Sequence, residues 1–424
     1  MIQLMSGPAA ASRLTANRNF RLLWGGDAAG QFGAQIAGFA LPIFAVQYLN
    51  ATEQQMGYLN AAESAAFLVI GLPVGAWVDH MRKRRVMIVA DLVRAALLTA
   101  LVVVALSGLA NIPILILVAL CMSVCNTFFD VSYQSFVPAL VGPEHLVEGN
   151  SKLEATRAVA MIGGPAVGGL LLRFMSAANL LGATVLTYLV SAFTLAKIDS
   201  VETLPPAQDR RPLLQEIRSG LSYVLTHRVL RRIVATTAIS NIFSAIGAAA
   251  VTIYILRFLG VSTEVYGLVF AIGSVGSLLG ALVADKMTGR LGHLAILPVS
   301  AFAWGVFNFL DPLAGFASGI WVPIMLTANF FLSSVFIVVY NIAQVSYRQK
   351  VCPPELLGRM NASVRFIIWG VIPIGGLIGG FLGQALGVWP TMWIAAAGGV
   401  FAVLPVLPAL WRDLETKKAG SQQE

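Results

Sequence analysis

The chain has 424 residues, of which 57% are hydrophobic and only 11% charged, and its mean hydropathy is +0.79. Soluble proteins carry about 25% charged residues, so this composition excludes a soluble globular protein. The formal net charge of +8 fits contact with anionic lipid headgroups, and we expect no nucleic-acid binding.

Twelve apolar segments follow one another, each long enough to cross a hydrocarbon core of about 30 Å. They lie near residues 20–48, 56–78, 86–107, 112–136, 151–173, 176–197, 232–257, 264–284, 294–313, 320–345, 360–386 and 388–411. Their succession predicts an all-α, polytopic membrane protein with twelve transmembrane helices. Residues 1–19 lack the apolar core of a cleavable signal, so we expect the first span to stay in the chain.

The basic residues indicate the orientation. Most of the 28 Lys and Arg fall before the first span, in the even-numbered loops or after the last span, and Arg348 is counted with these loop charges. Only Arg173 and Arg257 are expected at the opposite face. The positive-inside rule therefore predicts a multi-pass protein of the cell membrane with both termini in the cytoplasm.

Several charged residues fall inside the predicted spans, where an unpaired charge costs roughly 2.5–3.5 kcal/mol or more. Taken along the chain they are Asp27, Glu63, Asp91, Arg94, Asp130, Arg157 and Arg365. One interpretation is a layer of structural ion pairs, with Asp130 paired to Arg157 across the hairpin of spans four and five, and Asp91 paired to Arg94 along span three. Asp27, Asp130 and Arg157 are each about six or seven residues from a cytoplasmic end, which places them at a common depth of about 10 Å.

The other interpretation is proton coupling. Asp27 has no evident partner on its own helix, and Glu63 stands alone at a different depth. Burial disfavours the charged form of a carboxylate, so such acids suit reversible protonation. We expect the proton carriers among Asp27, Glu63 and Asp130. The second half shows no comparable acid in its predicted spans, so coupling is expected in the first half.

The fifth span contains the stretch MIGGPAVGGLLL, residues 161–172, in which glycines and a proline interrupt an apolar helix. Small residues let membrane helices approach closely, and neighbours can satisfy the backbone groups that a proline leaves free. Gly164, Pro165, Gly168 and Gly169 either pack a static bundle or form a smooth, kinked face against the counterpart span of the other half. The second interpretation predicts an interface that moves.

The chain divides into two similar halves. A polar segment with three prolines, DSVETLPPAQDRRP, precedes an amphipathic helix expected at 213–227. We therefore predict a six-helix bundle over residues 1–198, a cytoplasmic linker over 199–230 and a second six-helix bundle over 231–424. PEHLVEGN and PELLGRMN match at an offset of 211, which also places the glycines of span five on those of span eleven. An offset of 206 places Asp79 on Asp285 and Arg84 on Arg290. Parallel repeats of this kind are typical of one class of alternating-access transporter.

Several motifs resemble the major facilitator superfamily. GLPVGAWVDHMRKRR, residues 71–85, is similar to its signature between spans two and three, and GPAVGG, residues 164–169, is similar to the end of a drug/proton antiporter motif. NRNFRLLWGGDAAGQFG and FFDVSYQSFVPALV resemble the branch of macrolide efflux proteins and the enterobactin exporter. The resemblance implies that Asp79 helps to lock a cytoplasmic gate. The expected gating network comprises Asp79, Arg82, Arg84, Arg85, Asp91, Arg94, Arg157, Asp285, Arg359 and Arg365.

Polar and aromatic residues of the spans are candidates for a central cavity. They are Gln31, Asn126, Tyr133, Gln134, Asn241, Phe243, Tyr254, Asn341, Gln344 and Trp369. Their mixture suits a large amphipathic organic molecule such as a drug, a macrolide, a siderophore or another secondary metabolite. The sequence thus predicts a secondary active transporter that exports such a molecule in exchange for protons and that works as a monomer among membrane lipids.

Other classes of protein stay open. An importer or facilitator of a nutrient or lipid-like solute has the same architecture, and a membrane receptor or scaffold has no transport at all. An enzyme is not expected, because no nucleophile, metal-ligand cluster or phosphate-binding loop accompanies the four histidines. We expect no cofactor and no metal, and the absence of a nucleotide-binding loop leaves an ion gradient as the energy source.

Overall fold

The computed structural model describes residues 14–142, 145–199, 213–292, 294–353 and 356–407. In these residues the chain is helical and contains no strand. The elements are η1 (Leu14–Ala16), α1 (Arg18–Ile43), η2 (Phe44–Tyr48), α2 (Glu53–Asp79), α3 (Lys83–Leu106), α4 (Ile112–Val141), α5 (Leu146–Leu171), α6 (Ala177–Ala196), α7 (Leu213–Thr226), α8 (Arg228–Ile253), η4 (Tyr254–Phe258), α9 (Thr263–Leu291), α10 (Ile296–Phe307), α11 (Leu310–Leu313), η5 (Ala314–Phe316), α12 (Trp321–Val351), α13 (Leu357–Gly370), α14 (Ile372–Leu386) and α15 (Val388–Phe401).

Nine helical segments among the described residues are long and apolar enough to cross a membrane. Helices α2 and α5, which have 27 and 26 residues, are also long, and α15 is a shorter apolar helix of 14 residues. The predicted eleventh span is divided into α13 and α14, with Pro373 at the start of α14. The predicted ninth span consists of α10, α11 and η5. The prediction of an all-α, multi-pass membrane protein is confirmed.

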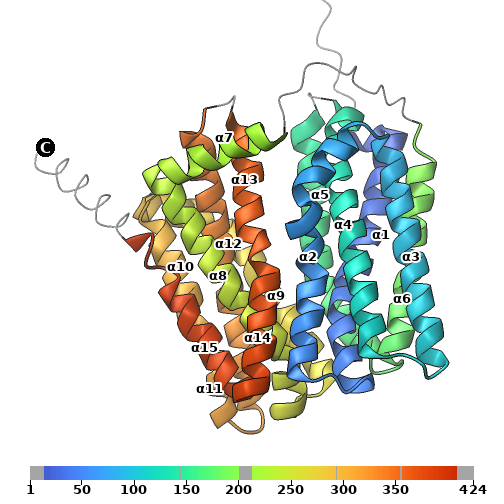
Figure 1. The fold of residues 1–424 in the computed structure, drawn as a ribbon, viewed down its shortest axis with the longest axis vertical. Coiled ribbons are helices and arrows are strands. Elements are labelled where there is room, and N and C mark those ends of the chain that lie inside the picture. Colours follow the sequence, from blue (N-terminus) through green and yellow to red (C-terminus); the bar gives the residue numbers. More distant parts are fainter. Residues whose placement is uncertain (1–13, 143–144, 200–212, 293, 354–355, 408–424) are drawn as a thin grey trace, which may run out of the picture.

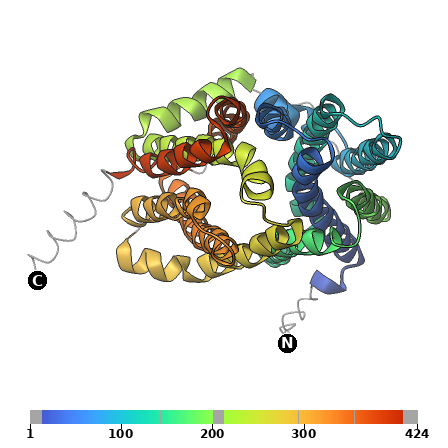
Figure 2. The same cartoon turned by 90° about the horizontal axis from the view of Figure 1, so that it is seen from below.

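Helices α1–α6 gather on one side of the molecule and α8–α15 on the other (Figure 1). We refer to residues 14–199 as the first half and to residues 213–407 as the second half. Helix α7 lies across the end of the second half against α13, and Tyr223 donates a hydrogen bond to the carbonyl of Val351. We call this the linker end and the opposite end, where α2 and α9 begin, the far end. Viewed end-on, α2 lies beside α14 and α5 beside α9 (Figure 2).

The apolar core differs between the two ends. One cluster of buried residues at the far end contains both first-half residues, such as Phe44 and Leu98, and second-half residues, such as Tyr254 and Tyr266. Toward the linker end, separate clusters form around Met87 in the first half and Tyr340 in the second. The halves therefore share one core at the far end and have separate cores toward the linker end.

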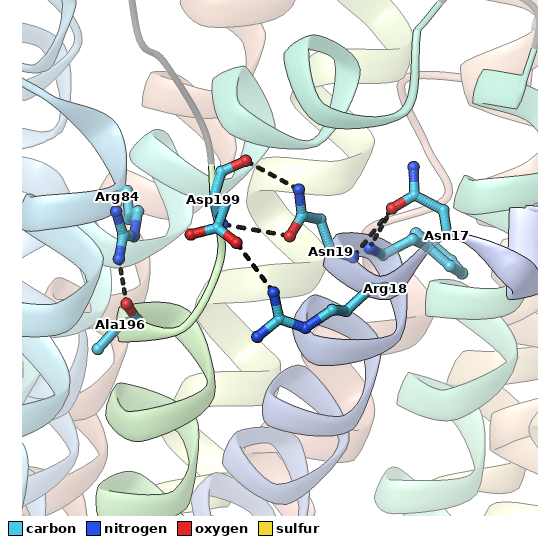
Figure 3. A network of polar contacts seen from close by, with 7 residues as sticks. Asn17, Arg18, Asn19, Arg84, Ala196 and Asp199 are labelled. Carbon is cyan, nitrogen blue, oxygen red and sulfur yellow. Dashed lines mark hydrogen bonds and ion pairs between the residues drawn. The ribbon is translucent and has the colours of Figure 1, made fainter.

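Polar contacts join the helix ends of the first half before residue 200 (Figure 3). Asp199 accepts a hydrogen bond from Arg18 at 2.9 Å and exchanges backbone hydrogen bonds with the Asn19 side chain. Asn17 caps the start of α1. Arg84 donates to the carbonyls of Leu195 and Ala196, so this cation satisfies two acceptors that the end of α6 leaves free.

Candidate functional site

A cavity of about 310 Å³ lies between helices of the two halves. Helices α2 and α4 of the first half and α13 and the start of α14 of the second half line it. The lining residues are Glu63, Ser64, Phe67, Ser123, Asn126, Thr127, Asp130, Val131, Gln134, Arg365, Trp369 and Ile372. Two of the three predicted proton carriers and three of the predicted cavity residues therefore meet at one place.

Glu63 enters the cavity from the middle of α2. Its Oε1 is buried and has no hydrogen-bond partner among the described residues. The Oδ1 of Asn60, one helical turn earlier, is likewise buried without a hydrogen-bond partner among the described residues. A buried polar atom without a partner costs about 1–3 kcal/mol, so a donor or cation brought to Glu63 would be favoured there; Asn60 is not among the residues that line the cavity.

Asp130 faces the cavity from α4. Arg94, Arg157 and Arg365 are near enough to interact electrostatically with its carboxylate, although none of them forms an ion pair with it within 4 Å. Arg365 Nη1 donates to Gln134 Oε1 at 3.1 Å, one turn along α4. This hydrogen bond joins the two halves in the wall of the cavity.

Two aromatic rings also meet across the halves. The ring centroids of Phe67 on α2 and Trp369 on α13 are 5.0 Å apart, with their planes inclined by 48°. Trp369 is 43% exposed, which leaves part of its ring open to the cavity. The cavity thus has an aromatic wall beside Glu63.

The ion pair expected along the third span is present. Arg94 Nη1 lies 2.9 Å from Asp91 Oδ1, and both side chains are almost completely buried. The guanidinium group also lies over the ring of Phe129 at 4.5 Å and that of Tyr188 at 5.4 Å. Such contacts hold Arg94 in place and stabilise its charge inside the bundle.

The predicted pair of Asp130 and Arg157 is wrong. Arg157 instead lies 4.0 Å from Glu154 on its own helix, with both side chains largely exposed. Arg157 and Glu154 are one turn apart and can pair while both stay exposed, whereas a pair across the hairpin requires the Arg157 guanidinium to lose water beside Asp130.

Asp27 does not lie on the cavity wall, and it does have a partner on its own helix. Gln31 Nε2 lies 3.3 Å from its Oδ1, and Tyr133 of α4 also interacts with the carboxylate. The prediction of a lone acid is therefore corrected. Gln31 and Tyr133, expected in the cavity, serve here as neighbours of Asp27.

The other predicted cavity residues are not among those that line this cavity. Asn241 donates to the carbonyl of Ile368, and Phe243 packs against Gly398 of α15. Tyr254 is buried in the far-end core and donates to the carbonyl of Asp311. Gln344 is buried within α12, and Asn341 is exposed on the same helix.

Two charged residues of the second half were missed or misplaced by the sequence analysis. Asp311, in α11, belongs to an apolar segment long enough to span a membrane, and it interacts with the buried Asn329 of α12. The second half therefore does contain an acid in its spans. Arg348 lies within α12 and is only 7% exposed, with Nε and Nη1 lacking partners among the described residues. Both lie close to a predicted span end, where hydropathy alone does not separate loop from helix.

Part of the expected gating network lies outside the described side chains, namely Asp79 and Arg359. Arg82 and Arg85 are exposed at the start of α3, and Asp285 is exposed near the end of α9. Arg84 has the structural role at the end of α6 described above.

The glycines of α5 face two different helices. A Cβ atom on Gly164 would clash with Gln35 of α1, and one on Gly168 would meet Phe39 of α1 at 3.2 Å. Only Gly169 meets the other half, where its Cβ would lie 2.7 Å from the Cα of Gly267 in α9. The expectation of one sliding face toward the counterpart span is wrong, because α5 packs against α9 and not against α14.

A second glycine crossing joins the halves at the same end. A Cβ on Gly380 of α14 would lie 2.7 Å from the Cα of Gly57 in α2. The sequence repeat places Gly169 on Gly380, so the two crossings are equivalent positions of the two repeats. Both bring helix backbones together near the far end.

Arg257 also joins the halves at the far end. Its guanidinium donates to the carbonyls of Ala51, at 2.7 Å, and Val46, from the π-helical turn that ends the first span. Arg257 lies in the corresponding turn of the second half, η4. One of the cations expected at the face opposite the basic loops thus bridges the two halves.

The sequence profile of the transmembrane secretion effector family matches residues 10–423. Macrolide efflux protein A of Streptococcus pyogenes is 23% identical over 92% of this chain and 94% of its own. The multidrug efflux pump Tap of Mycolicibacterium fortuitum is 24% identical over 83% of this chain and 86% of its own. The enterobactin exporter EntS of Shigella dysenteriae is 23% identical over 87% and 85%, respectively.

Solved transporters share the fold. A bacterial homologue of the iron transporter ferroportin, in an inward-facing state, superposes with a TM-score of 0.75, 18% identity and coverage of 93% of this chain and 98% of its own. The nucleoside transporter NupG gives a TM-score of 0.72 with 13% identity, over 93% of this chain and 99% of its own. At these identities the likeness concerns the fold alone.

Proposed function

Because the chain belongs to the transmembrane secretion effector family of the major facilitator superfamily, we propose that it is a proton-coupled exporter of amphipathic organic molecules. Its relatives are transporters and not enzymes. The observation that carries the proposal is the cavity between the halves, whose wall combines two carboxylic acids with aromatic and amide side chains.

We also propose that the protein has twelve membrane spans in two six-helix bundles, over residues 1–198 and 231–424, joined by the cytoplasmic linker 199–230. Both termini lie in the cytoplasm, and the protein acts as a monomer in the cell membrane. The shared far-end core, the two glycine crossings and the Arg257 bridge support a state that is closed to the outside. The separate cores toward the linker end support access from the cytoplasm.

In this mechanism the substrate enters from the cytoplasm, the far-end contacts separate, and the substrate leaves outside. Protons that enter from outside then reset the carrier. Asp27, Glu63 and Asp130 are the proposed proton-carrying groups, since each lies within a helix and away from the exposed basic loops. The antiporter-type motif Gly164, Pro165, Gly168 and Gly169 lets α5 pack closely against α1 and α9 while the halves move.

Transport assays in inside-out vesicles test this function. Vesicles from cells that make the protein should take up a macrolide, a siderophore or an organic cation when a proton gradient is imposed, and a protonophore should abolish the uptake. The importer alternative predicts accumulation in right-side-out vesicles instead. If neither orientation shows protein-dependent flux of any compound in a diverse panel, the transport function is wrong and a receptor or scaffold is favoured.

A further inference from the structure

The charges on the cavity wall are not equivalent. Arg365 of α13 interacts with the Asp130 carboxylate of α4 and is hydrogen-bonded to Gln134. No cationic side chain among the described residues forms an ion pair with Glu63. Three arginines interact with Asp130, whereas no cationic side chain of the described residues interacts with Glu63, so Glu63 is the cavity acid without a compensating charge in this part of the chain.

The groups beside Glu63 are acceptors and ring faces. Asn60 Oδ1 and Glu63 Oε1, one turn apart on α2, are both buried without a hydrogen-bond partner among the described residues, and of the two residues only Glu63 lines the cavity. Phe67 follows one turn later and packs against Trp369. Carboxylate oxygens attract a cation, and the negative face of an aromatic ring does the same, whereas both repel an anion.

We propose that this part of the cavity, formed by Glu63, Phe67 and Trp369, binds a substituted ammonium group of the transported molecule. The inference rests on the proposed export function and adds the charge of the substrate to it. The ammonium group lies against the Glu63 carboxylate, and the apolar body of the molecule lies along the ring pair. The cavity volume of about 310 Å³ accommodates a phenyl ring with a quaternary ammonium group.

A matched set of probes tests the charge directly. Benzyltrimethylammonium is a permanent cation, neopentylbenzene is its neutral analogue of the same shape, and benzylsulfonate is an anion of similar size. Binding to the purified full-length protein is measured by equilibrium dialysis. We expect the cation to bind at least about tenfold more tightly than either analogue, the difference that one favourable charge contact supplies. Equal binding of the three probes, or preference for the sulfonate, would overturn the inference.

Variants locate the site. Glu63→Gln keeps the size of the side chain and should weaken cation binding about tenfold, and Phe67→Leu should weaken it severalfold because it removes a ring face. Glu148→Gln makes the same chemical change on α5 outside the cavity, beside Lys152, and should leave binding unchanged. Cation binding that survives Glu63→Gln in full places the ligand elsewhere and contradicts the inference.

Folding and function are separated by two further readouts. Each variant is compared with the wild type by size-exclusion chromatography and thermal melting, and if Glu63→Gln does not fold, Phe67→Leu and the probe series on the wild type still decide the outcome. A wild-type protein that transports a solute but binds no cation overturns this inference and leaves the export function intact. Cation binding without gradient-driven flux supports the site and contradicts the export function.

Discussion

Asp27 and Glu63 are acids in very different surroundings. Asp27 is buried between α1 and α4, where Gln31 and Tyr133 contact it, whereas Glu63 lines the cavity and its Oε1 has no hydrogen-bond partner among the described residues. Gln31 and Tyr133 are neutral polar partners that hold the carboxyl group in a defined position, and Arg157 and Glu154, which carry opposite charges, act on it more weakly. Asp27 is accordingly suited to lose and regain a proton, and Glu63, a proposed proton carrier of the cavity wall, to bind a cation once its own proton has left.

Replacing Asp27 tests its role in coupling. Asp27→Asn keeps the size of the side chain and removes the titratable group, so gradient-driven export should fall to the level of vesicles without the protein, while insertion and yield are retained. Asp199→Asn, on an exposed residue of the linker end, is the control and should export normally. Full export by Asp27→Asn would remove this residue from the mechanism.

The buried ion pair of Asp91 and Arg94 is expected to affect the stability of the protein. Neutralising one member leaves an uncompensated charge inside the bundle, so Asp91→Asn or Arg94→Gln should lower the free energy of unfolding by about 3–5 kcal/mol. The double variant should recover much of this loss. Thermal melting in detergent measures the series.

The pair of Arg18 and Asp199 is the matched control, because its side chains are 63% and 82% exposed. Its removal should change stability by less than about 1 kcal/mol. If the double variant at positions 91 and 94 melts as low as the worse single variant, the two residues do not stabilise one another.

At the scale of helices, the two halves meet where glycines allow backbones to touch. Neighbouring glycines of α5 have separate roles: Gly168 faces Phe39 within the first half, and Gly169 faces Gly267 of the second half. The equivalent contact of Gly380 with Gly57 shows that the repeat reproduces this packing on the other side of the molecule. Membrane helices gain little from apolar contact as such, so this close fit is what holds the far end together.

Bulk at Gly169 should therefore prevent closure of the far end. Gly169→Leu places a side chain where only 2.7 Å separates a Cβ from the backbone of α9, so it should insert normally but lose flux. The cavity should then stay open to the outside. In a protein whose Cys121, Cys125 and Cys352 have been replaced, a cysteine introduced at Ser64 in the cavity should remain accessible to membrane-impermeant thiol reagents added outside.

Two leucine variants control for this result. Val167→Leu enlarges an exposed residue of the same helix and should transport at the native rate. Gly168→Leu clashes with Phe39 inside the first half and should lower stability more than it changes accessibility. Native transport by Gly169→Leu would show that the crossing is not required to close.

Arg257 provides a second, polar contact between the same ends. Gln47 takes the place of Arg257 in the corresponding π-helical turn of the first half, and this turn therefore carries no cation that could form the reciprocal bridge. Arg257→Gln removes the charge and one of the two hydrogen bonds, and it should shift the equilibrium toward a far end that is open. Spin labels at the exposed residues Gln47 and Phe258 should report a longer distance in a larger fraction of molecules. An unchanged distance distribution would contradict a role in closure.

For the whole molecule, hydropathy and charge predicted the class of fold because lipid imposes the same length and polarity on every span. They did not predict which spans touch. The repeat correctly made span five equivalent to span eleven, but equivalence in sequence does not imply contact, and α5 packs against α9 while α14 packs against α2.

The candidate site was predicted in part for a related reason. Charged residues inside spans are conspicuous, so Glu63, Asp130 and Arg365 were identified from the sequence. Their meeting in one cavity depends on the packing of α2, α4 and α13, which no local pattern contains. The partners of Arg157 and Asp27 were not predicted. Arg157 pairs with Glu154, an ordinary surface residue, and Asp27 interacts with Tyr133, an ordinary residue of a span.

Simultaneous measurement of proton and solute fluxes decides whether a proton gradient drives solute movement through this cavity. Purified protein is reconstituted into liposomes that contain a pH-sensitive dye, a pH gradient is imposed, and labelled solute is followed in the same vesicles. For a proton-coupled exporter, solute accumulates against its concentration gradient while protons move in the opposite direction in a fixed ratio. Both movements should be lost together in Asp27→Asn. Solute that merely equilibrates, at a rate unaffected by the pH gradient and by this substitution, would contradict proton-coupled export.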